Sequence, residues 1–474
     1  VSVVNALSRR LDVEIKRAGA VWREDEQRSR QSNRPVIGAG SGLTIRSVRW
    51  PGGCFADYYH WRDGIGPRDE RPAQVNTIWG AVTEDNSFGT HEFMGLVDRL
   101  NAEPIIVGNV GSGTVEEMAD WWKYLNHEGP GPMADLREEN GRAEPWGVEY
   151  FGVGNESWGC GGQMRPQYYA DLYKRFAEYL RPQFGTEPFR IAAGPNGSDY
   201  EWMRTLMEEA GYMIDGIDLH HYTIVGTWED KGSATDFAED GWFEAMQGAR
   251  YMDELLTRHS TIMDRYDPEK ETALIVGEWG MWHDPMPGTN PGFLKQQNTL
   301  RDALVAALHL NIFNQHADRV RMANLAQTVN VLQALVLYDD GQLVKTPTYH
   351  IFDMYKAHQD ATLLPMNLER GMYAHEGEET PAVSASASVD DQGRIHVTVA
   401  NTDPNQPRTV TTELRGQDVS SVSGRVLTAD QMNTHNTFDA PNRLAPTSFD
   451  GAQLEGNTLT IELPAKSVVS LEVR

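Results

Sequence analysis

Short apolar segments alternate with helical patterns through most of the chain, and this alternation limits the fold more than any other feature. The strand-like segments are residues 47–50, 104–110, 148–153, 190–193, 216–220, 273–276 and 319–325. Candidate helices lie between most of them, at residues 89–100, 114–126, 167–184, 200–210, 243–266 and 298–316. Strands that alternate with helices pair in parallel. Seven or eight such units in about 300 residues favour a closed (β/α)8 barrel over an open sheet.

Two of the candidate helices have one clear apolar face. In residues 167–184, side chains four positions apart form the face Tyr168, Leu172, Phe176 and Leu180. In residues 298–316 the corresponding face is Leu300, Leu304, Leu308 and Ile312. Side chains at this spacing share one side of a helix, so we expect both faces to be buried.

The pattern changes after about residue 365, where apolar and polar residues alternate with a period of two. The alternating segments are residues 383–389, 394–400, 408–414, 458–463 and 468–473, with turn residues between them. This predicts an antiparallel β-sandwich, with sugar binding as the lesser alternative to a purely structural role. We therefore divide the chain into a divergent N-terminal segment (1–45), a catalytic barrel (46–365) and a β-sandwich (366–474).

Charge and cysteine content exclude several classes of partner. The net charge is −26, from 42 basic and 68 acidic residues, which argues against nucleic acid or an anionic membrane surface. The chain shows no signal peptide and no apolar run of membrane-spanning length, so a soluble cytoplasmic protein is expected. Its two cysteines, Cys54 and Cys160, form no visible disulfide framework and have no metal-ligand spacing, so no metal site is expected.

Two glutamates follow strand-like segments and suggest the chemistry. The run at 148–153 ends at Gly154 and is followed by Asn155 and Glu156, and a second run ends at Gly277 before Glu278. Catalytic residues of a (β/α)8 barrel lie at the carboxyl ends of the strands. A pair of carboxyl groups there is what cleavage of a glycosidic bond requires. An isolated Asn-Glu pair is more often solvated surface, so the hypothesis depends on the second glutamate.

Further polar residues follow other strands. Arg49 begins the segment Arg-Trp-Pro-Gly-Gly-Cys-Phe-Ala-Asp, where it could hold a catalytic carboxylate or close a structural salt bridge inside the barrel. Cys54 is expected to line the site as a small, weakly polar residue. His220 and His221 lack a third ligand at zinc spacing, so we expect hydrogen bonding there, and Tyr222 could donate its hydroxyl to a carboxylate.

These segments together resemble one enzyme family. Residues 49–68, Gly154-Asn155-Glu156, Gly277–Gly280 and residues 323–333 resemble the α-L-arabinofuranosidases of glycoside hydrolase family 51. The resemblance runs from about residue 48 to the C-terminus, and the Pro-Gly-Gly-Cys-Phe-Ala-Asp segment with its continuation is its most specific part. Residues 1–45 do not match: they lack the family's first barrel strand, with its sugar-binding glutamate.

The resemblance implies a role for each candidate residue. It implies a (β/α)8 barrel with a β-sandwich, no cofactor, Glu156 as acid/base on the fourth strand and Glu278 as nucleophile on the seventh. Asn155 would bind the sugar 2-hydroxyl and Arg49 would support Glu278. Cys54, Tyr222 and Gln333 would line the subsite for the arabinofuranose ring, and Trp79 would contact the leaving sugar.

The expected function is that of a retaining, exo-acting α-L-arabinofuranosidase. It would release terminal non-reducing arabinofuranosyl residues from arabinoxylan or arabinan oligosaccharides. Members of the family are often intracellular and often hexameric, so a homo-oligomer, up to a hexamer, is predicted. Two alternatives stay open on the sequence: the same fold acting on β-xylosides or β-glucans, and a catalytically impaired sugar-binding protein.

Overall fold

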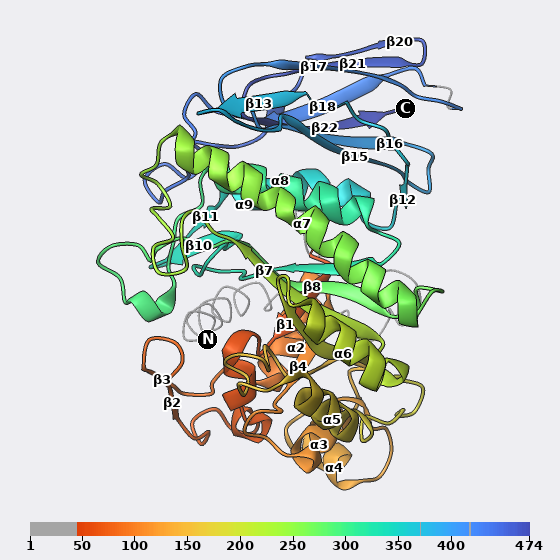
Figure 1. Ribbon diagram of the computed structural model, residues 1–474. Helices are drawn as coiled ribbons and strands as arrows, with labels where there is room; N and C mark the ends of the chain where they lie inside the picture. Colours follow the sequence, from red (N-terminus) through yellow and green to blue (C-terminus); the bar gives the residue numbers. More distant parts are fainter. Residues whose placement is uncertain (1–44, 370, 417–418) are drawn as a thin grey trace, which may run out of the picture. The chain divides into compact units, whose positions relative to one another are not determined.

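The computed structural model describes residues 45–369, 371–416 and 419–474 (Figure 1). The predicted divergent segment, apart from Ile45, lies outside the described residues. The prediction that it lacks the first barrel strand falls on those same residues. Contacts divide the chain into two compact units. The first contains the described residues up to His220 together with Thr261–Gly277, and the second contains His221–Ser260 together with Glu278–Arg474.

One seven-stranded sheet in the described residues contains the strands that alternate with helices. Its order is β1-β4-β5-β6-β7-β8-β9. The pairs from β1 to β7 are parallel, which confirms the prediction for these strands. The strands from β4 to β8 are mostly buried, and Ile106, Phe151 and Val153 are fully buried, as expected for a parallel sheet with covered faces. Their bounds are Ser47–Trp50 (β1), Glu103–Gly108 (β4), Tyr150–Val153 (β5), Phe189–Asn196 (β6), Gly216–Thr223 (β7), Ala273–Met281 (β8) and Val320–Leu325 (β9).

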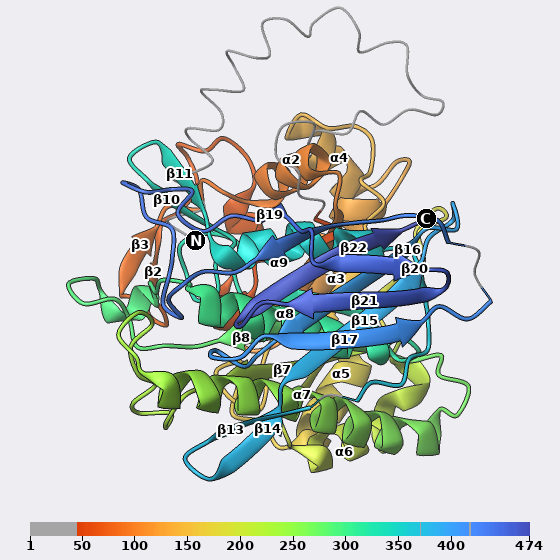
Figure 2. The ribbon, with the colours of Figure 1, turned by 90° about the horizontal axis from the view of Figure 1, so that it is seen from above.

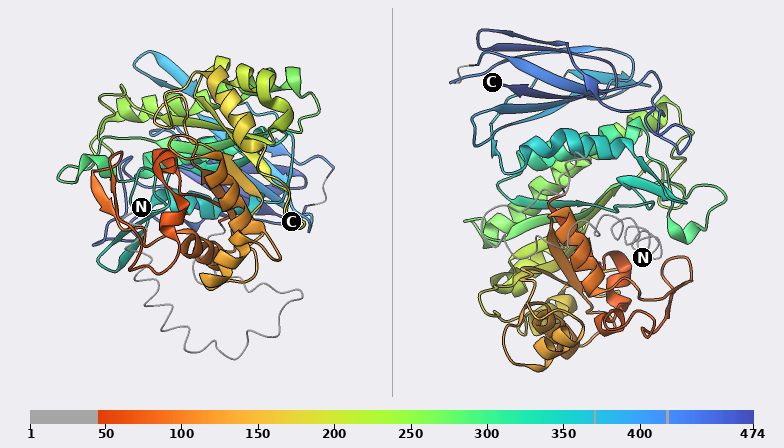
Figure 3. Two further views of the ribbon diagram at one scale, coloured as in Figure 1. Left: turned by 90° about the horizontal axis from the view of Figure 1, so that it is seen from below. Right: turned by 180° about the vertical axis from the view of Figure 1, so that it is seen from behind.

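Helices lie between the strands of this sheet, and two of them, α3 and α4, lie between β4 and β5. Two of the helices begin at side-chain caps: Thr114 accepts a hydrogen bond from the Glu117 N–H, and Asp199 accepts one from the Trp202 N–H. Figure 3 shows the helices from below and from behind, in orange to yellow-green. Their bounds are Thr90–Leu100 (α2), Val115–Asn126 (α3), Pro132–Glu139 (α4), Pro166–Ala177 (α5), Tyr200–Ala210 (α6) and Glu239–Tyr266 (α7).

The face that the spacing predicts for residues 167–184, where α5 lies, is only partly buried: Phe176 and Leu180 are buried, but Tyr168 is not. Tyr168 is 53% exposed, whereas Tyr169 and Tyr173 are fully buried. Their hydroxyl groups explain the difference: Tyr169 donates to the Val153 carbonyl at 2.6 Å, and Tyr173 donates to the Met213 carbonyl at 3.0 Å. A tyrosine can be buried at low cost when its hydroxyl finds such a partner, and an apolar spacing rule does not count hydroxyl partners.

Both units also contain short elements, among them a hairpin and several 3₁₀ turns. The hairpin of Gln74–Asn76 (β2) and Val82–Glu84 (β3) follows two 3₁₀ turns, Gly53–Tyr58 (η1) and Trp61–Gly64 (η2). Three further turns occur later in the described residues: Gly211–Met213 (η3), Pro291–Phe293 (η4) and Lys356–His358 (η5).

The end of the second unit consists of antiparallel strands, as predicted. Six strands form one sheet in the order β12-β15-β16-β22-β18-β19, and three form another in the order β17-β21-β20 (Figure 2). Alternate residues of β21, Leu459, Ile461 and Leu463, are buried. The bounds are Thr362–Leu363 (β12), Val383–Val389 (β15), Ile395–Asn401 (β16), Arg408–Glu413 (β17), Val422–Leu427 (β18), Thr447–Ser448 (β19), Ala452–Glu455 (β20), Thr458–Leu463 (β21) and Ser467–Val473 (β22). Two hairpins form separate two-stranded sheets: Val336–Asp339 with Gln342–Lys345 (β10, β11) and Met372–His375 with Glu378–Pro381 (β13, β14).

Helix α8 (Leu300–Gln315) packs against the first of these sheets. Three of its polar side chains bond β15: Asn311 and Asn314 donate to serine hydroxyls, and Gln315 donates to the Ala385 carbonyl at 2.7 Å. Its predicted apolar face is buried, but so is most of the rest of its surface. The neighbouring α9 spans Pro347–Tyr355. Among the described residues, no helix combines the length and the apolar character that a bilayer crossing requires.

Candidate active site

Glu156 stands at a sharp turn where β5 ends. Gly154 has φ +83°, and a Cβ atom there would lie 2.5 Å from a methyl group of Val110, so only glycine fits this position. Glu156 itself has φ +43°, a left-handed conformation that is uncommon for a residue with a side chain. Its carbonyl accepts hydrogen bonds from the N–H groups of Gly159 and Gly161, which stabilise the turn.

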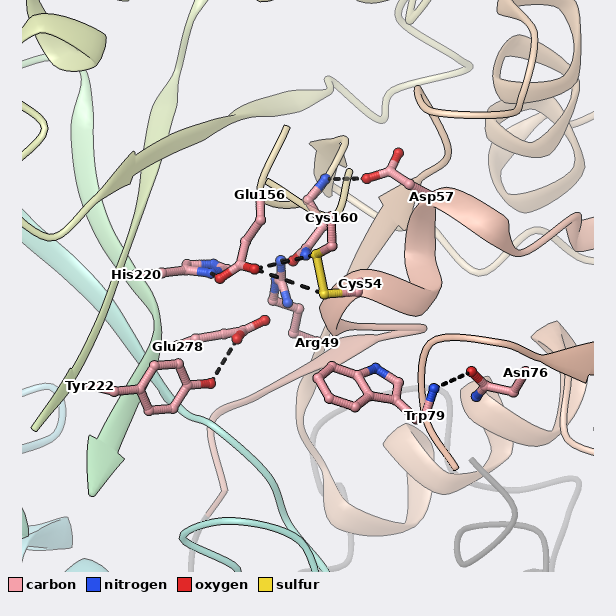
Figure 4. The surroundings of a disulfide bond; sticks show 11 residues. Arg49, Cys54, Asp57, Asn76, Trp79, Glu156, Cys160, His220, Tyr222 and Glu278 are labelled. Carbon is pink, nitrogen blue, oxygen red and sulfur yellow. Dashed lines mark hydrogen bonds and ion pairs between the residues drawn. A yellow bond between two sulfur atoms is a disulfide. The ribbon is translucent and has the colours of Figure 1, made fainter. Parts of the chain in front are cut away.

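The two carboxylate oxygens of Glu156 have different neighbours: His220 lies beside one, and the disulfide of Cys54 and Cys160 lies beside the other (Figure 4). Nδ1 of His220 lies 2.9 Å from its Oε1, and Nε2 of the same ring lies 3.3 Å from Oδ2 of Asp218. The sulfur atoms of Cys160 and Cys54 lie 3.4 and 3.9 Å from its Oε2. These two sulfurs form a disulfide and carry no proton, so they contact Oε2 without donating a hydrogen bond.

The disulfide is not among the sequence predictions, and the sugar contact expected of Cys54 stays a prediction. Cys54 is bonded to Cys160, 106 positions further along the chain. The two residues meet because η1 follows β1 and the turn at Glu156 follows β5, and both of these strands pair with β4. No sequence spacing reveals such a pairing, because it depends on the order of strands in the sheet.

Asp57 connects the loop after β1 to the loops after β4 and β5 by hydrogen bonds, a role that sequence reasoning missed. Its carboxylate accepts from the N–H groups of Val110 at 2.7 Å, Gly111 at 2.9 Å and Asn155 at 2.9 Å. Burial raises the pKa of Asp57 to about 6, although these hydrogen bonds and the charge of Arg49 act in the opposite direction. The signal in the sequence is an acid that ends the apolar Cys-Phe-Ala segment.

The side chains of Arg49 and Asn155 contact each other in this part of the site. Nη2 of Arg49 donates to Oδ1 of Asn155 at 2.6 Å and lies 3.3 Å from Oδ2 of Asp218. A structural salt bridge is one of the two roles that the sequence suggests for Arg49, and the contact with Asp218 is such a bridge. The other role, support of Glu278 by Arg49, stays a prediction. Burial alone would raise the pKa of Asp218, but His220 and Arg49 lower it below its usual value.

The amide nitrogen of Asn155 is available as a donor. Asn155 is 1% exposed, and its Nδ2 has no hydrogen-bond partner among the described residues. A buried donor without a partner is costly, so a ligand oxygen is its natural acceptor. The geometry therefore suits the expected contact of Asn155 with a sugar hydroxyl, which stays a prediction.

In the second unit, Glu278 lies on β8 and is 8% exposed. The hydroxyl of Tyr222 donates to its Oε2 at 2.8 Å, which confirms that Tyr222 can hold a carboxylate (Figure 4). The Tyr222 ring packs edge-on against Trp282, with 4.9 Å between ring centroids. One oxygen of Glu278 is thus held by a hydrogen bond from a ring that is itself fixed by packing.

The two remaining predicted residues lie in different surroundings. Gln333 is 1% exposed, and its Nε2 donates to Oδ1 of Asp302 at 2.7 Å. Trp79 is half-buried in the turn of the β2–β3 hairpin, and its backbone N–H donates to Oδ1 of Asn76 at 2.9 Å. The sugar contacts expected of Gln333 and Trp79 stay predictions.

The sequence matches two family models and several curated proteins. The models are the α-L-arabinofuranosidase 1 domain, over residues 40–239, and the α-L-arabinofuranosidase C-terminal domain, over residues 277–467. An intracellular exo-α-L-arabinofuranosidase of Bacteroides ovatus is 48% identical, over 93% of this chain and 86% of that protein. A probable α-L-arabinofuranosidase C of Aspergillus terreus is 30% identical, over 85% of this chain and 81% of that protein.

Solved structures agree with the fold. The arabinofuranosidase of glycoside hydrolase family 51 from Xanthomonas axonopodis pv. citri has a TM-score of 0.91 and 47% identity, covering 93% of this chain and 89% of that one. The Thermotoga maritima α-L-arabinofuranosidase in complex with arabinose has a TM-score of 0.79 and 27% identity, covering 92% and 89%. The predicted fold class, a (β/α)8 barrel with a C-terminal antiparallel domain, is therefore confirmed. A bifunctional glucanase-xylanase, CelM2, shares the fold alone, at 13% identity and a TM-score of 0.59.

Proposed function

Because this chain belongs to the α-L-arabinofuranosidases of glycoside hydrolase family 51, we propose that it removes terminal arabinofuranosyl residues by a retaining, two-glutamate mechanism. As a member of that family it is a glycoside hydrolase with α-L-arabinofuranosidase activity. The Bacteroides relative is named an exo-enzyme, which supports release of single residues from the non-reducing end.

The observation that carries the proposal is that β7 supplies a partner to each candidate carboxylate. His220 lies beside Glu156, and Tyr222 donates to Glu278. Side chains two residues apart on a strand point to the same face, about 7 Å apart at their Cα atoms. A retaining mechanism needs two carboxyl groups roughly 5–5.5 Å apart. Partners this close together on one strand support the pairing of Glu156 with Glu278.

In the first proposed step, Glu278 attacks the anomeric carbon of the bound arabinofuranoside. The bond from this carbon to the leaving oxygen breaks, and Glu156 transfers its proton to that oxygen. The product is an arabinosyl ester of Glu278 and a free alcohol. Tyr222 holds the other carboxylate oxygen, so that one oxygen of Glu278 stays oriented for attack.

In the second step, Glu156 is ionised and takes a proton from water. The water oxygen attacks the anomeric carbon, the ester bond to Glu278 breaks, and arabinose leaves with its original configuration. Asn155 offers its free amide N–H to a sugar hydroxyl in both steps, an interaction that strengthens as positive charge develops on the ring.

The test uses Glu156→Ala and Glu278→Ala with aryl α-L-arabinofuranosides of differing leaving group. General acid catalysis contributes about 10²- to 10⁴-fold, so Glu156→Ala should lose most activity on poor leaving groups. Azide should then restore turnover and give a glycosyl azide of retained configuration. Glu278→Ala should be inactive on all of them. Glu149→Ala, which changes an exposed glutamate just before β5, is the matched control and should behave as the parent.

Two results would overturn the proposal. If neither glutamate variant changes turnover, these residues are not the catalytic pair. If the parent hydrolyses an aryl β-xyloside but not the arabinofuranoside, the substrate is wrong. Activity on arabinoxylan and arabinan oligosaccharides, followed by quantifying released arabinose, tests the proposed natural substrates.

We extend the proposal to cell compartment and assembly. The Bacteroides relative is named intracellular, which supports an intracellular enzyme, as predicted from the sequence. Cell fractionation checks this. Assembly into a homo-oligomer, up to a hexamer, is checked by light scattering coupled to gel filtration, where a single-chain mass would contradict it.

A further inference from the structure

Asp302 is a fully buried carboxylate beside the expected sugar subsite. Its Oδ2 accepts from the N–H of Thr299 at 2.7 Å and from the Thr299 hydroxyl at 2.9 Å, as part of the N-terminal cap of α8. Its Oδ1 lies 2.7 Å from Nε2 of Gln333 and 2.9 Å from Nε2 of His283. Both oxygens are therefore fully used by groups of the second unit.

Asp302 is ionised at any working pH. Burial would raise its pKa, but the charges of His283 and Arg301 and the hydrogen bonds outweigh burial and lower the pKa to about 2. An ionised carboxylate only accepts hydrogen bonds. The group that Gln333 presents to Asp302 must therefore be its NH₂, and its carbonyl oxygen must face the other way.

The carbonyl oxygen of Gln333 is left for a ligand. Among the described residues, Oε1 accepts no hydrogen bond, although the side chain is 1% exposed. The aliphatic part of the side chain packs on Gly280, where a Cβ atom would lie 2.5 Å from Cγ of Gln333. Gly280 is two residues beyond Glu278 on β8, so Gln333 lies against the strand that carries the proposed nucleophile.

We propose that Asp302 is a positioning residue that fixes the amide of Gln333, so that Oε1 of Gln333 accepts a hydrogen bond from a hydroxyl of the bound arabinofuranose. The proposal rests on the proposed function, which places Gln333 in the sugar subsite. Without Asp302 the amide can rotate by half a turn and present a donor instead of an acceptor, at a position where the sugar hydroxyl needs an acceptor.

A double-mutant cycle of Asp302→Asn and Gln333→Ala measures this coupling. Each single change should lower kcat/KM on an aryl α-L-arabinofuranoside about 10- to 100-fold, as expected for one buried hydrogen bond. If Asp302 acts through Gln333, Asp302→Asn should change kcat/KM less than about twofold when Gln333 is already alanine. Independent, multiplying effects would overturn the proposal, and so would a Gln333→Ala variant with parental kcat/KM.

Loss of the α8 cap is separated from loss of positioning by a control. Thr114→Ala removes the side-chain cap of α3, a helix of the first unit. It should lower the unfolding temperature but leave kcat/KM unchanged. If Asp302→Asn lowers kcat/KM no more than Thr114→Ala does, Asp302 has only a structural role.

A second variant keeps the proposal testable if Asp302→Asn does not fold. Gln333→Glu places a second carboxyl group against Asp302, where only its protonated form can donate to Oδ1 as the parental amide does. The ratio of parental to variant kcat/KM should therefore shrink several-fold as the pH falls from 7 to 5. A ratio that does not change with pH contradicts the proposal.

Failure of the proposed function is distinguishable from failure of this inference. If the parent has no α-L-arabinofuranosidase turnover, the proposed function is wrong. The same cycle is then measured on L-arabinose binding by calorimetry, where additive effects of the two substitutions overturn the positioning role.

Discussion

At the scale of single residues, the sequence reveals the acids but not their partners. Glu156 and Glu278 stand out because each follows an apolar run that ends at glycine. The sequence does not single out Asp57, Asp218 or Asp302, because the role of each carboxylate depends on which N–H groups or cations the fold places beside it. Asp218 carries a partial signal, since an acid inside an otherwise apolar strand must have a partner.

Tyr222→Phe should weaken catalysis without weakening the fold. The variant loses the hydroxyl that donates to Glu278 at 2.8 Å but keeps the ring that packs on Trp282. We expect kcat/KM to fall about 10- to 100-fold, with an unchanged unfolding temperature. Tyr168→Phe, at an exposed tyrosine of α5, is the control. Parental kcat/KM in Tyr222→Phe would show that the hydroxyl has no part in orienting the nucleophile.

At the scale of elements, the sequence predicts most strands and helices of the barrel, but it does not predict the short elements or every buried face. The (β/α) alternation predicts β1, β4 to β9 and their helices because periodicity reports burial directly. It misses α4 and the β2–β3 hairpin, which are short and mostly polar. It also misplaces part of the buried face of α5, where Tyr169 and Tyr173, whose hydroxyl groups have backbone partners, are buried and Tyr168 is exposed.

Asp57→Ala should destabilise the loops after β1, β4 and β5 together. It leaves three N–H groups, of Val110, Gly111 and Asn155, without their acceptor. We expect a loss of unfolding free energy on the order of 3 kcal/mol, measured by urea unfolding, together with loss of activity. Asp171→Ala, at an exposed position of α5, is the control and should change neither quantity. An equally small effect of both substitutions would show that water replaces the lost acceptor.

The disulfide should stabilise the protein through the length of chain that it closes. Cys54 and Cys160 are 106 positions apart, and cross-linking a loop of this size stabilises by up to about 5 kcal/mol in the chain-entropy description. The double variant Cys54→Ser/Cys160→Ser should therefore unfold at lower urea than the oxidised parent. Treatment of the parent with a dithiol should reproduce that shift, and the variant itself should not respond. A dithiol-insensitive parent would contradict the expectation.

At the scale of the whole molecule, buried neutral histidines should limit stability in acid. Burial lowers the pKa of His309 to about 3, and that of His221, His350 and His358 to about 4. These folded-state values lie below the unfolded value of about 6.5, so the unfolded chain binds more protons as the pH falls. Their contribution to stability is therefore complete above pH 6.5 and is lost below it.

His309→Gln isolates one of these groups. Relative to neutral pH, the parent should lose about 2 kcal/mol of unfolding free energy at pH 5 through His309 alone. The variant should not show that loss. The unfolding free energy of the variant should therefore rise relative to that of the parent as the pH falls. His435→Gln, at a surface position, is the control. Parallel pH profiles of parent and His309→Gln would contradict the assignment.

The path of the chain between the two compact units has a consequence for cooperativity. Within the described residues, the chain passes from one unit to the other inside β7, inside α7 and inside β8, and it crosses through no loop between elements. Each crossing element contributes residues to both units, so neither unit can lose its structure without breaking a strand or helix of the other. We therefore expect a single calorimetric transition, and limited proteolysis should release no half of the described chain that remains folded by itself.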